Sequence, residues 1–154
     1  MTIDSREQRS GVPQLVTAPH IVVGNHEFDY DFRPLFIVER KTWQDFLASR
    51  RQYENIGAVR VNKVVRQLFR AMKFAQSVWL ILEGTYTEDS NGYICDTKWT
   101  AVSTHAFLMR LQLRGVQVAY TIDATATARL IDKLYRYSLE ASKAWPMELI
   151  HATA

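Results

Sequence analysis

The sequence predicts an α/β fold in which helices cover a mixed central sheet. Several short apolar or β-branched runs near the start of the chain are typical of strands. Farther along, such runs alternate with longer segments of helical periodicity, as strands and helices do in α/β domains. The length of 154 residues suits one domain.

The N-terminal part of the chain is expected to hold four strands. The run Phe28–Phe32 (FDYDF) alternates aromatic and acidic residues, so one face is apolar and the other carries Asp29 and Asp31. The continuous apolar run Leu35–Val38 is typical of a strand covered on both faces. The other two candidate strands are residues 2–5 and His20–Gly24, with a short helix or turn up to Pro13 between them.

The rest of the chain is expected to alternate helices and strands. Thr42 and Asp123 are suitable helix N-caps, and Gly115 is a suitable stop for a helix. The last helix should end before Pro146. The predicted helices are residues 42–50, 58–75, 99–114 and 124–144, the predicted strands are 78–82 and 116–122, and residues 85–97 form a loop with a turn at Asn91-Gly92.

Composition excludes several classes of protein. Cys95 is the only cysteine, which excludes an internal disulfide and a cysteine-rich zinc site. No apolar run is long enough to span a membrane, and the charged N-terminus lacks the apolar stretch of a signal peptide. We therefore expect a cytoplasmic protein, or a nuclear one in a eukaryote, with one domain over residues 1–146 and a C-terminal tail over 147–154.

The net charge of +3 is small, but the basic residues are unevenly placed. They are concentrated between Arg40 and Lys73, where only Asp45 and Glu54 oppose them, and the preceding segment Glu27–Asp31 is acidic. An acidic pocket beside a basic strip is what a metal-using phosphodiesterase needs, although a solvated helix face would carry the same charges. The candidate phosphate contacts are Arg60, Lys63, Arg66, Arg70 and Lys73.

The run Val38–Lys41 (VERK) carries the most distinctive chemistry. Successive strand residues alternate between faces, so Glu39 and Lys41 project together, opposite Arg40. A hairpin with the neighbouring strand would bring Asp29 and Glu39 within reach of one cation such as Mg²⁺, which takes one or two protein carboxylates. Lys41 would stabilise developing negative charge, or orient or deprotonate the attacking water. Taken alone, the pattern also fits surface charges at a strand end.

Five segments occur in an order shared with a known family. Val38–Phe46 (VERKTWQDF) contains Glu-Arg-Lys followed by an acid four residues later, and Asp29 precedes it at the expected spacing. The other segments are Ile3–Glu7 (IDSRE), Gln67 ahead of Trp79–Gly84 (WLILEG), Gly115–Thr121, and Thr127-Ala128. Over residues 2–140 the chain therefore resembles the XPF-type nuclease family, which includes the archaeal Hef nuclease.

The chain departs from the family pattern in three ways, and one of its acids has a rival alignment. Phe28 stands where a glycine usually precedes the first metal-binding acid, and Lys63 stands where arginine is expected. Gly24-Asn25 offers a rival alignment in which Asn25 takes the place of Asp29, with a longer gap before Glu39. Most relatives carry a tandem helix-hairpin-helix module after the nuclease domain, and the sequence lacks one, so we expect a stand-alone domain.

The resemblance implies a restriction-endonuclease-like core with a Mg²⁺ or Mn²⁺ site. Asp29 and Glu39 would hold the metal together with a backbone oxygen of Arg40, and Lys41 would be the catalytic lysine. Further residues implied at the metal site are Asp4 and Glu7, of which Glu7 would lie nearer the ion. The nucleic-acid contacts implied are Arg6, Lys63, Arg66, Gln67 and Arg70.

Several positions have two interpretations each. Arg40 either pairs with Asp45 or contacts DNA, and Gln67 either touches the site or the DNA or is a helix-surface amide. Glu83 either supports the site or is a charge at a strand end. His26 is either a metal neighbour or a solvated loop residue.

The resemblance leads us to expect a metal-dependent DNA endonuclease. By analogy, its substrate would be branched or otherwise structured DNA, such as a flap, fork or Holliday junction, in repair or recombination. The alternative is a catalytically inactive DNA-binding or scaffold subunit of a nuclease complex. Relatives usually pair through the C-terminal helices, so a homodimer is expected, with Leu134, Tyr135 and Leu139 as candidate partner contacts.

Overall fold

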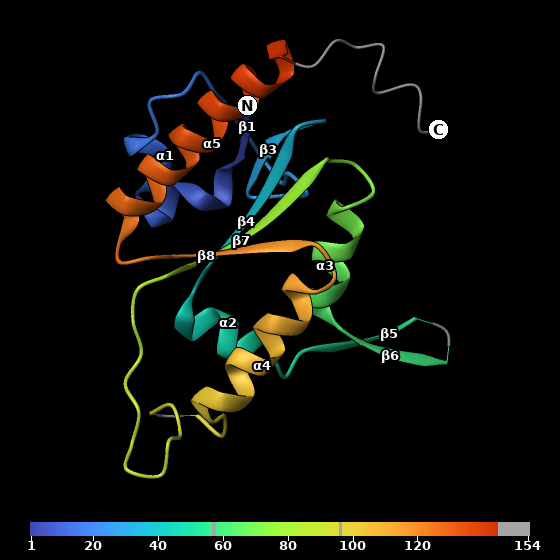
Figure 1. The fold of residues 1–154 in the computed structure, drawn as a ribbon, viewed down its shortest axis with the longest axis vertical. Helices are drawn as coiled ribbons and strands as arrows, with labels where there is room; N and C mark the ends of the chain where they lie inside the picture. Colours follow the sequence, from blue (N-terminus) through green and yellow to red (C-terminus); the bar gives the residue numbers. More distant parts are fainter. Residues whose placement is uncertain (57, 96, 145–154) are drawn as a thin grey trace.

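The computed structural model describes residues 1–56, 58–95 and 97–144, and a six-stranded mixed sheet crosses this part of the chain (Figure 1). Its strands are β1 (Thr2–Asp4), β2 (Ile21–Val23), β3 (Tyr30–Phe32), β4 (Phe36–Thr42), β7 (Ser77–Glu83) and β8 (Val116–Thr121). They lie in the order β2-β1-β3-β4-β7-β8. Strand β3 is antiparallel to both of its neighbours, and the other pairs are parallel.

Helices cover both faces of this sheet, which confirms the predicted fold class (Figure 1). The 3-10 helix η1 (Ser5–Ser10), α1 (Val12–Leu15) and α5 (Ala124–Ala144) lie on one face, and α2 (Trp43–Ser49), α3 (Lys63–Ala71) and α4 (Ala101–Gln112) lie on the other. Strand side chains alternate between faces. Ile37 of β4 is therefore buried with α2, α3 and α4, whereas Phe36 and Val38 are buried with α5.

The region predicted as one helix over residues 58–75 is instead a strand followed by a shorter helix. Strand β6 (Val59–Asn62) pairs antiparallel with β5 (Tyr53–Ile56), and this ribbon projects from the body of the domain (Figure 1). The Asn62 side chain accepts hydrogen bonds from the backbone N–H groups of Val64 and Val65, which fixes the start of α3. Arg60, expected on that helix, therefore lies on β6.

Other predicted boundaries are confirmed by their caps. Thr42 Oγ1 accepts a hydrogen bond from the backbone N–H of Asp45 (3.1 Å) at the start of α2. Gly115 has a φ of +93° after α4, as expected of a glycine that ends a helix. The predicted stop at Pro146 and the tail over residues 147–154 lie outside the described residues. Within the described ranges, no helix is both long and apolar enough to cross a bilayer.

Candidate active site

Asp29 lies beside the end of β4 because β3 and β4 are antiparallel neighbours. It directly precedes β3 rather than forming part of it. The backbone N–H of Arg40 donates a hydrogen bond to Asp29 Oδ2 (2.8 Å), and the backbone N–H of Asp4 donates to the Asp29 carbonyl (3.0 Å). Asp29 lines a pocket together with Glu39, and Asn25 is not among the lining residues. This favours the alignment in which Asp29, rather than Asn25, takes the place of the family's first metal-binding acid.

Glu39 projects into this pocket, which has a volume of about 330 Å³ and which we call the carboxylate pocket. Lys41 Nζ donates to Glu39 Oε1 (2.8 Å), and Gln67 Nε2 of α3 donates to Glu39 Oε2. Both carboxylate oxygens are therefore held, and Lys41 lies on the face of β4 that strand alternation predicts. Of the residues predicted for the site, this pocket brings together Arg6, Glu7, Asp29, Glu39, Arg40, Lys41, Lys63 and Gln67.

Three acids of the carboxylate pocket lie close to one another, with Glu39 buried and Asp29 and Glu7 partly buried. Burial and the charge of Glu39 raise the pKa of Asp29 to about 8, and burial and the charge of Asp29 raise the pKa of Glu7 to about 7. Burial also raises the pKa of Glu39. Burial lowers the pKa of Lys41, but the charge and hydrogen bond of Glu39 outweigh this and give a net increase, so the lysine stays charged. A cation would relieve the repulsion between the acids.

Arg40 projects from the opposite face of β4 and binds two acids there. Its Nε donates to Glu83 Oε2 (2.9 Å) at the end of β7, and its Nη1 lies 3.5 Å from Glu7 Oε2. The predicted pair between Arg40 and Asp45 is therefore wrong. Asp45 instead accepts a hydrogen bond from Thr42 Oγ1 (2.8 Å) at the cap of α2, because it lies on the other side of the strand.

Glu83 has a second partner that the sequence did not indicate. Thr127 Oγ1 of α5 donates to Glu83 Oε2 (2.6 Å), and the Thr121 and Thr127 hydroxyls lie 2.7 Å apart. Glu83 is thus a support for Arg40 rather than a free strand-end charge. In the sequence, both residues belong to segments that occur in the family's order, Trp79–Gly84 and Thr127-Ala128. That order does not indicate that Glu83 and Thr127 form a hydrogen bond with each other.

Asp4 faces Arg6 rather than the carboxylate pocket, so the expectation that it lines the pocket is not met. It caps η1 by accepting a hydrogen bond from the backbone N–H of Arg6 (2.8 Å), and Arg6 Nε donates to Asp4 Oδ2 (2.8 Å). The hydrogen bond from the Arg6 side chain holds the pKa of Asp4 below its usual value. This local cap engages the carboxylate, and Asp4 is not among the residues that line the pocket. The exposed Arg6 side chain itself lines the pocket edge.

A second pocket, of about 280 Å³, adjoins the carboxylate pocket and is called here the basic pocket. Arg66 and Arg70 of α3 line it, and each has an acidic partner: Arg66 contacts Glu54, and Arg70 Nε lies 2.7 Å from Glu27 Oε1. These pairs are partly exposed, so they are weak and leave the arginines available to other anions. The residues that line both pockets are Arg6, Lys63 and Gln67.

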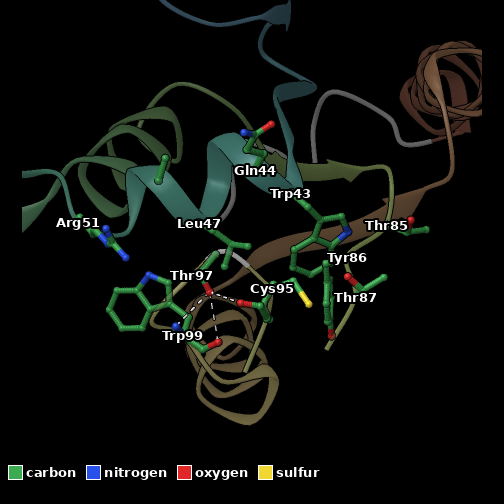
Figure 2. A pocket seen from close by; sticks show the side chains of 12 residues that line it. Trp43, Gln44, Leu47, Arg51, Thr85, Tyr86, Thr87, Cys95, Thr97 and Trp99 are labelled. Carbon is green, nitrogen blue, oxygen red and sulfur yellow. Dashed lines mark hydrogen bonds between the residues drawn. The ribbon is translucent and has the colours of Figure 1, made fainter. Parts of the chain in front are cut away.

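An aromatic pocket of about 510 Å³, which the sequence did not predict, lies against the other face of α2. Trp43 and Leu47 line it, whereas Asp45 of the same helix lines the carboxylate pocket. Figure 2 shows Trp43 and Tyr86 together on one side, with ring centroids 4.6 Å apart, and Trp99 on the other. Much of its far wall comes from the segment over residues 85–97, for which the sequence predicted only a loop.

The carboxylate pocket offers two acids to a cation rather than a larger cluster. Over the described ranges, no group of three or more His, Cys, Asp and Glu side chains is placed to hold a metal. Asp29 and Glu39 nevertheless fit Mg²⁺ or Mn²⁺, because such ions take one or two carboxylates, and the charge of the buried Glu39 disfavours a second charge on the partly buried Asp29. His26 is not among the pocket residues; its Nε2 lies 3.0 Å from Asp31 Oδ2, without hydrogen-bond geometry.

Fold and site together define an α/β domain with two acids and a lysine at the end of a central strand. A family model described as the ERCC4 domain matches residues 3–134, so the chain belongs to the ERCC4 domain family. This membership confirms the resemblance found in the sequence. Among the curated proteins, no match was found.

Solved structures similar to this chain include two of XPF. XPF from Aeropyrum pernix is 28% identical with a TM-score of 0.71, over 89% of this chain and 60% of that one. XPF from Aeropyrum pernix in complex with DNA is 27% identical with a TM-score of 0.67, over 91% of this chain and 64% of that one. The chain therefore spans less than two thirds of the length of these structural relatives.

Proposed function

We propose that this chain is a metal-dependent endonuclease that hydrolyses phosphodiester bonds in DNA. The observation that carries the proposal is the arrangement of Asp29 and Glu39 beside Lys41, in a pocket that adjoins a basic one. DNA is the proposed substrate because a similar structure, XPF from Aeropyrum pernix, is a complex with DNA. We extend this to branched or otherwise structured DNA, such as a flap, fork or Holliday junction in repair or recombination, by analogy with the family.

In this proposal Asp29 and Glu39 hold a Mg²⁺ or Mn²⁺ ion, with Glu7 close by. When bound, the ion supplies Lewis-acid stabilisation of the phosphate oxygens and activates water for attack. Gln67 orients Glu39 through one carboxylate oxygen, and Lys41 contacts the other. The charged Lys41 stabilises the negative charge that develops on the phosphate as the bond to the leaving oxygen breaks.

The DNA backbone is proposed to lie across the basic pocket. Arg66 and Arg70 would exchange their exposed acidic partners for phosphates, and Arg6 and Lys63 would contact the phosphates nearest the reaction site. Such contacts release counterions, so binding should weaken steeply with salt. Charge reversal at Arg66 and Arg70 should weaken binding to all sequences alike, and an effect confined to one sequence would contradict this assignment.

We also propose a homodimer that uses the C-terminal helices. Helix α4 leaves Val102, Met109 and Leu113 exposed on one side, with relative exposures of 81%, 62% and 84%. Strand β8 beside it is the edge of the sheet, and an open edge next to an apolar stripe favours association. Two of the α5 candidates, Leu134 and Tyr135, pack partly against the core instead. Light scattering of wild type and Leu113→Glu tests this, since a monomeric wild type would overturn it.

The nuclease proposal is tested by incubating the pure protein with labelled duplex, single strand, flap, fork and four-way junction, in Mg²⁺, Mn²⁺ and EDTA. Cleavage should require metal and should be lost in Asp29→Asn and Lys41→Ala. The exposed Glu88→Gln variant is the matched control and should cut like wild type. Activity that persists in both site variants would refute the site, whereas binding without any cleavage in Mn²⁺ would favour the inactive scaffold subunit.

A further inference from the structure

Tyr30 is a buried polar residue to which the proposed chemistry assigns no role. It lies on β3 directly after Asp29, and it belongs to the hydrophobic core that α5 covers, with no exposed surface. Its hydroxyl group donates a hydrogen bond to Glu7 Oε2 (3.2 Å). Phenylalanine would fill the same space without burying a hydroxyl, so packing alone does not account for a tyrosine here.

Glu7 reaches the carboxylate pocket from η1, and its side chain is held by residues of other elements. The helix η1 is short and has no buried residue, so it does not by itself fix a long and flexible side chain. The Tyr30 hydroxyl and Arg40 Nη1 both contact Glu7 Oε2. These contacts come from β3 and β4, the strands that also place Asp29 and Glu39, so the three acids share one frame.

Of the two groups that contact Glu7 Oε2, Arg40 is bound mainly elsewhere. Its guanidinium donates to Glu83 (Nε to Oε2, 2.9 Å), whereas its Nη1 lies 3.5 Å from Glu7. Burial and the charge of Glu7 raise the pKa of Tyr30, so the phenol keeps its proton and remains a donor to the acid. The bond from Tyr30 is long for two oxygen atoms, as hydrogen bonds of unloaded active sites often are.

Glu7 lies near the proposed metal-binding pair without forming a three-acid cluster with it. The charge of Asp29 contributes to the raised pKa of Glu7, and both residues line the carboxylate pocket with Glu39. Within residues 1–56, 58–95 and 97–144, however, no three side chains of His, Cys, Asp or Glu are placed to hold one ion. Mg²⁺ usually keeps several water molecules beside its one or two carboxylates. A neighbouring third acid can therefore act on the ion through such a water.

We propose that Tyr30 is a positioning residue, which fixes Glu7 where its carboxylate accepts hydrogen bonds from the water molecules of a bound Mg²⁺ or Mn²⁺ ion. Tyr30 touches neither the ion nor the DNA and acts through Glu7. The inference rests on the proposed metal site and deepens it, because it assigns Glu7 an indirect role and identifies the group that supports it. Groups that orient the surroundings of a metal typically change its affinity by about 10–100-fold when they are removed.

The test is calorimetric titration of the metal-free protein with Mn²⁺ in the absence of DNA, which measures ion binding without cleavage. The variants are Tyr30→Phe, Glu7→Gln and the double variant, with Asp29→Asn as the reference for a lost direct ligand. Tyr86→Phe is the matched control, because the Tyr86 hydroxyl is also hydrogen-bonded, to His105 Nε2 (2.7 Å), and Tyr86 does not line the carboxylate pocket. Thermal unfolding in EDTA checks that each variant keeps its fold.

Tyr30→Phe should weaken Mn²⁺ binding by about tenfold, and Tyr86→Phe by less than about twofold. In the Glu7→Gln background the effect of Tyr30→Phe should shrink to less than about twofold, because Tyr30 acts through Glu7. Glu7→Gln should also retain tighter Mn²⁺ binding than Asp29→Asn, since it removes no direct ligand.

Three results would overturn the inference: no effect of Tyr30→Phe, an undiminished effect in the Glu7→Gln background, or a loss in Glu7→Gln as large as in Asp29→Asn. The proposed metal site would still stand in each case if wild type binds Mn²⁺ and Asp29→Asn does not. A wild type that binds no Mn²⁺ would overturn both.

Discussion

Replacing Glu83 by alanine should destabilise the domain far more than the loss of a surface ion pair. Arg40 and Glu83 have side-chain exposures of only 9% and 11%. Glu83→Ala removes both carboxylate contacts to the Arg40 guanidinium and the acceptor for the Thr127 hydroxyl. The arginine would then keep Glu7, whose Oε2 lies 3.5 Å from Arg40 Nη1, as an acidic neighbour, and this distance is too long for a strong charge pair.

The magnitude follows from this geometry. Breaking a buried ion pair by deleting one partner costs about 3–5 kcal/mol, because the other charge stays buried. The partial exposure of this pair and the residual contact with Glu7 place the loss near the lower end, at about 3 kcal/mol. In a domain of this size 1 kcal/mol corresponds to about 2–4 °C, so the unfolding midpoint should fall by about 6–12 °C.

Urea and thermal unfolding followed by circular dichroism measure this directly. Glu83→Gln keeps an acceptor for Arg40 and should show a smaller loss than Glu83→Ala. The exposed Glu88→Ala variant is the control and should remain within about 0.5 kcal/mol of wild type. A loss below about 1 kcal/mol in Glu83→Ala would mean that the pair behaves like a solvated one, and the structural role of Arg40 would be refuted.

Three further predictions concern the carboxylate pocket. Asp29→Asn should raise the unfolding midpoint in EDTA, because asparagine needs no proton at a site where burial and Glu39 disfavour a charge, and should abolish stabilisation by Mn²⁺; a lower midpoint in EDTA would contradict this. In the metal-free protein the pKa values of Asp29 and Glu7 are raised to about 8 and about 7. The folded state therefore binds more protons than the unfolded state between about pH 5 and 8. The urea midpoint should consequently fall as the pH rises through that window. Gln67→Leu should weaken metal affinity or cleavage by about 10–100-fold, read from Mn²⁺ titrations, while the exposed Gln112→Leu should have no effect.

The parts of the structure that the sequence predicted depend on local periodicity. Alternation along a strand needs no knowledge of distant contacts, so it placed Glu39 and Lys41 on one face and Arg40 on the other. Caps are equally local, and Thr42 and Gly115 occupy the boundaries expected of them. The pairing of β3 with β4 followed because adjacent short strands usually form a hairpin.

Local patterns failed where two structures fit the same residues. The apolar spacing of residues 58–62 suits a strand as well as a helix, and the Asn62 cap decides between them. Asp4 was expected in the pocket, but the first turn of η1 competes for its carboxylate. The partner of Arg40 depended on parallel pairing of β4 with β7, strands far apart in the chain, and periodicity carries no information about such a register.

The run Val38–Lys41 (VERK) therefore has different roles on the two faces of β4. On the face toward α2 and α3, Glu39 and Lys41 meet Asp29 in a pocket where burial and neighbouring carboxylates raise the pKa of both Asp29 and Glu39, an arrangement that is unfavourable without a cation. On the opposite face, Arg40 is held by acids and contributes to stability. Loss of a carboxylate should consequently have opposite signs on the two faces: stabilising at Asp29 in the metal-free protein and destabilising at Glu83. That contrast separates the reactive function of the motif from its structural one by stability measurements alone.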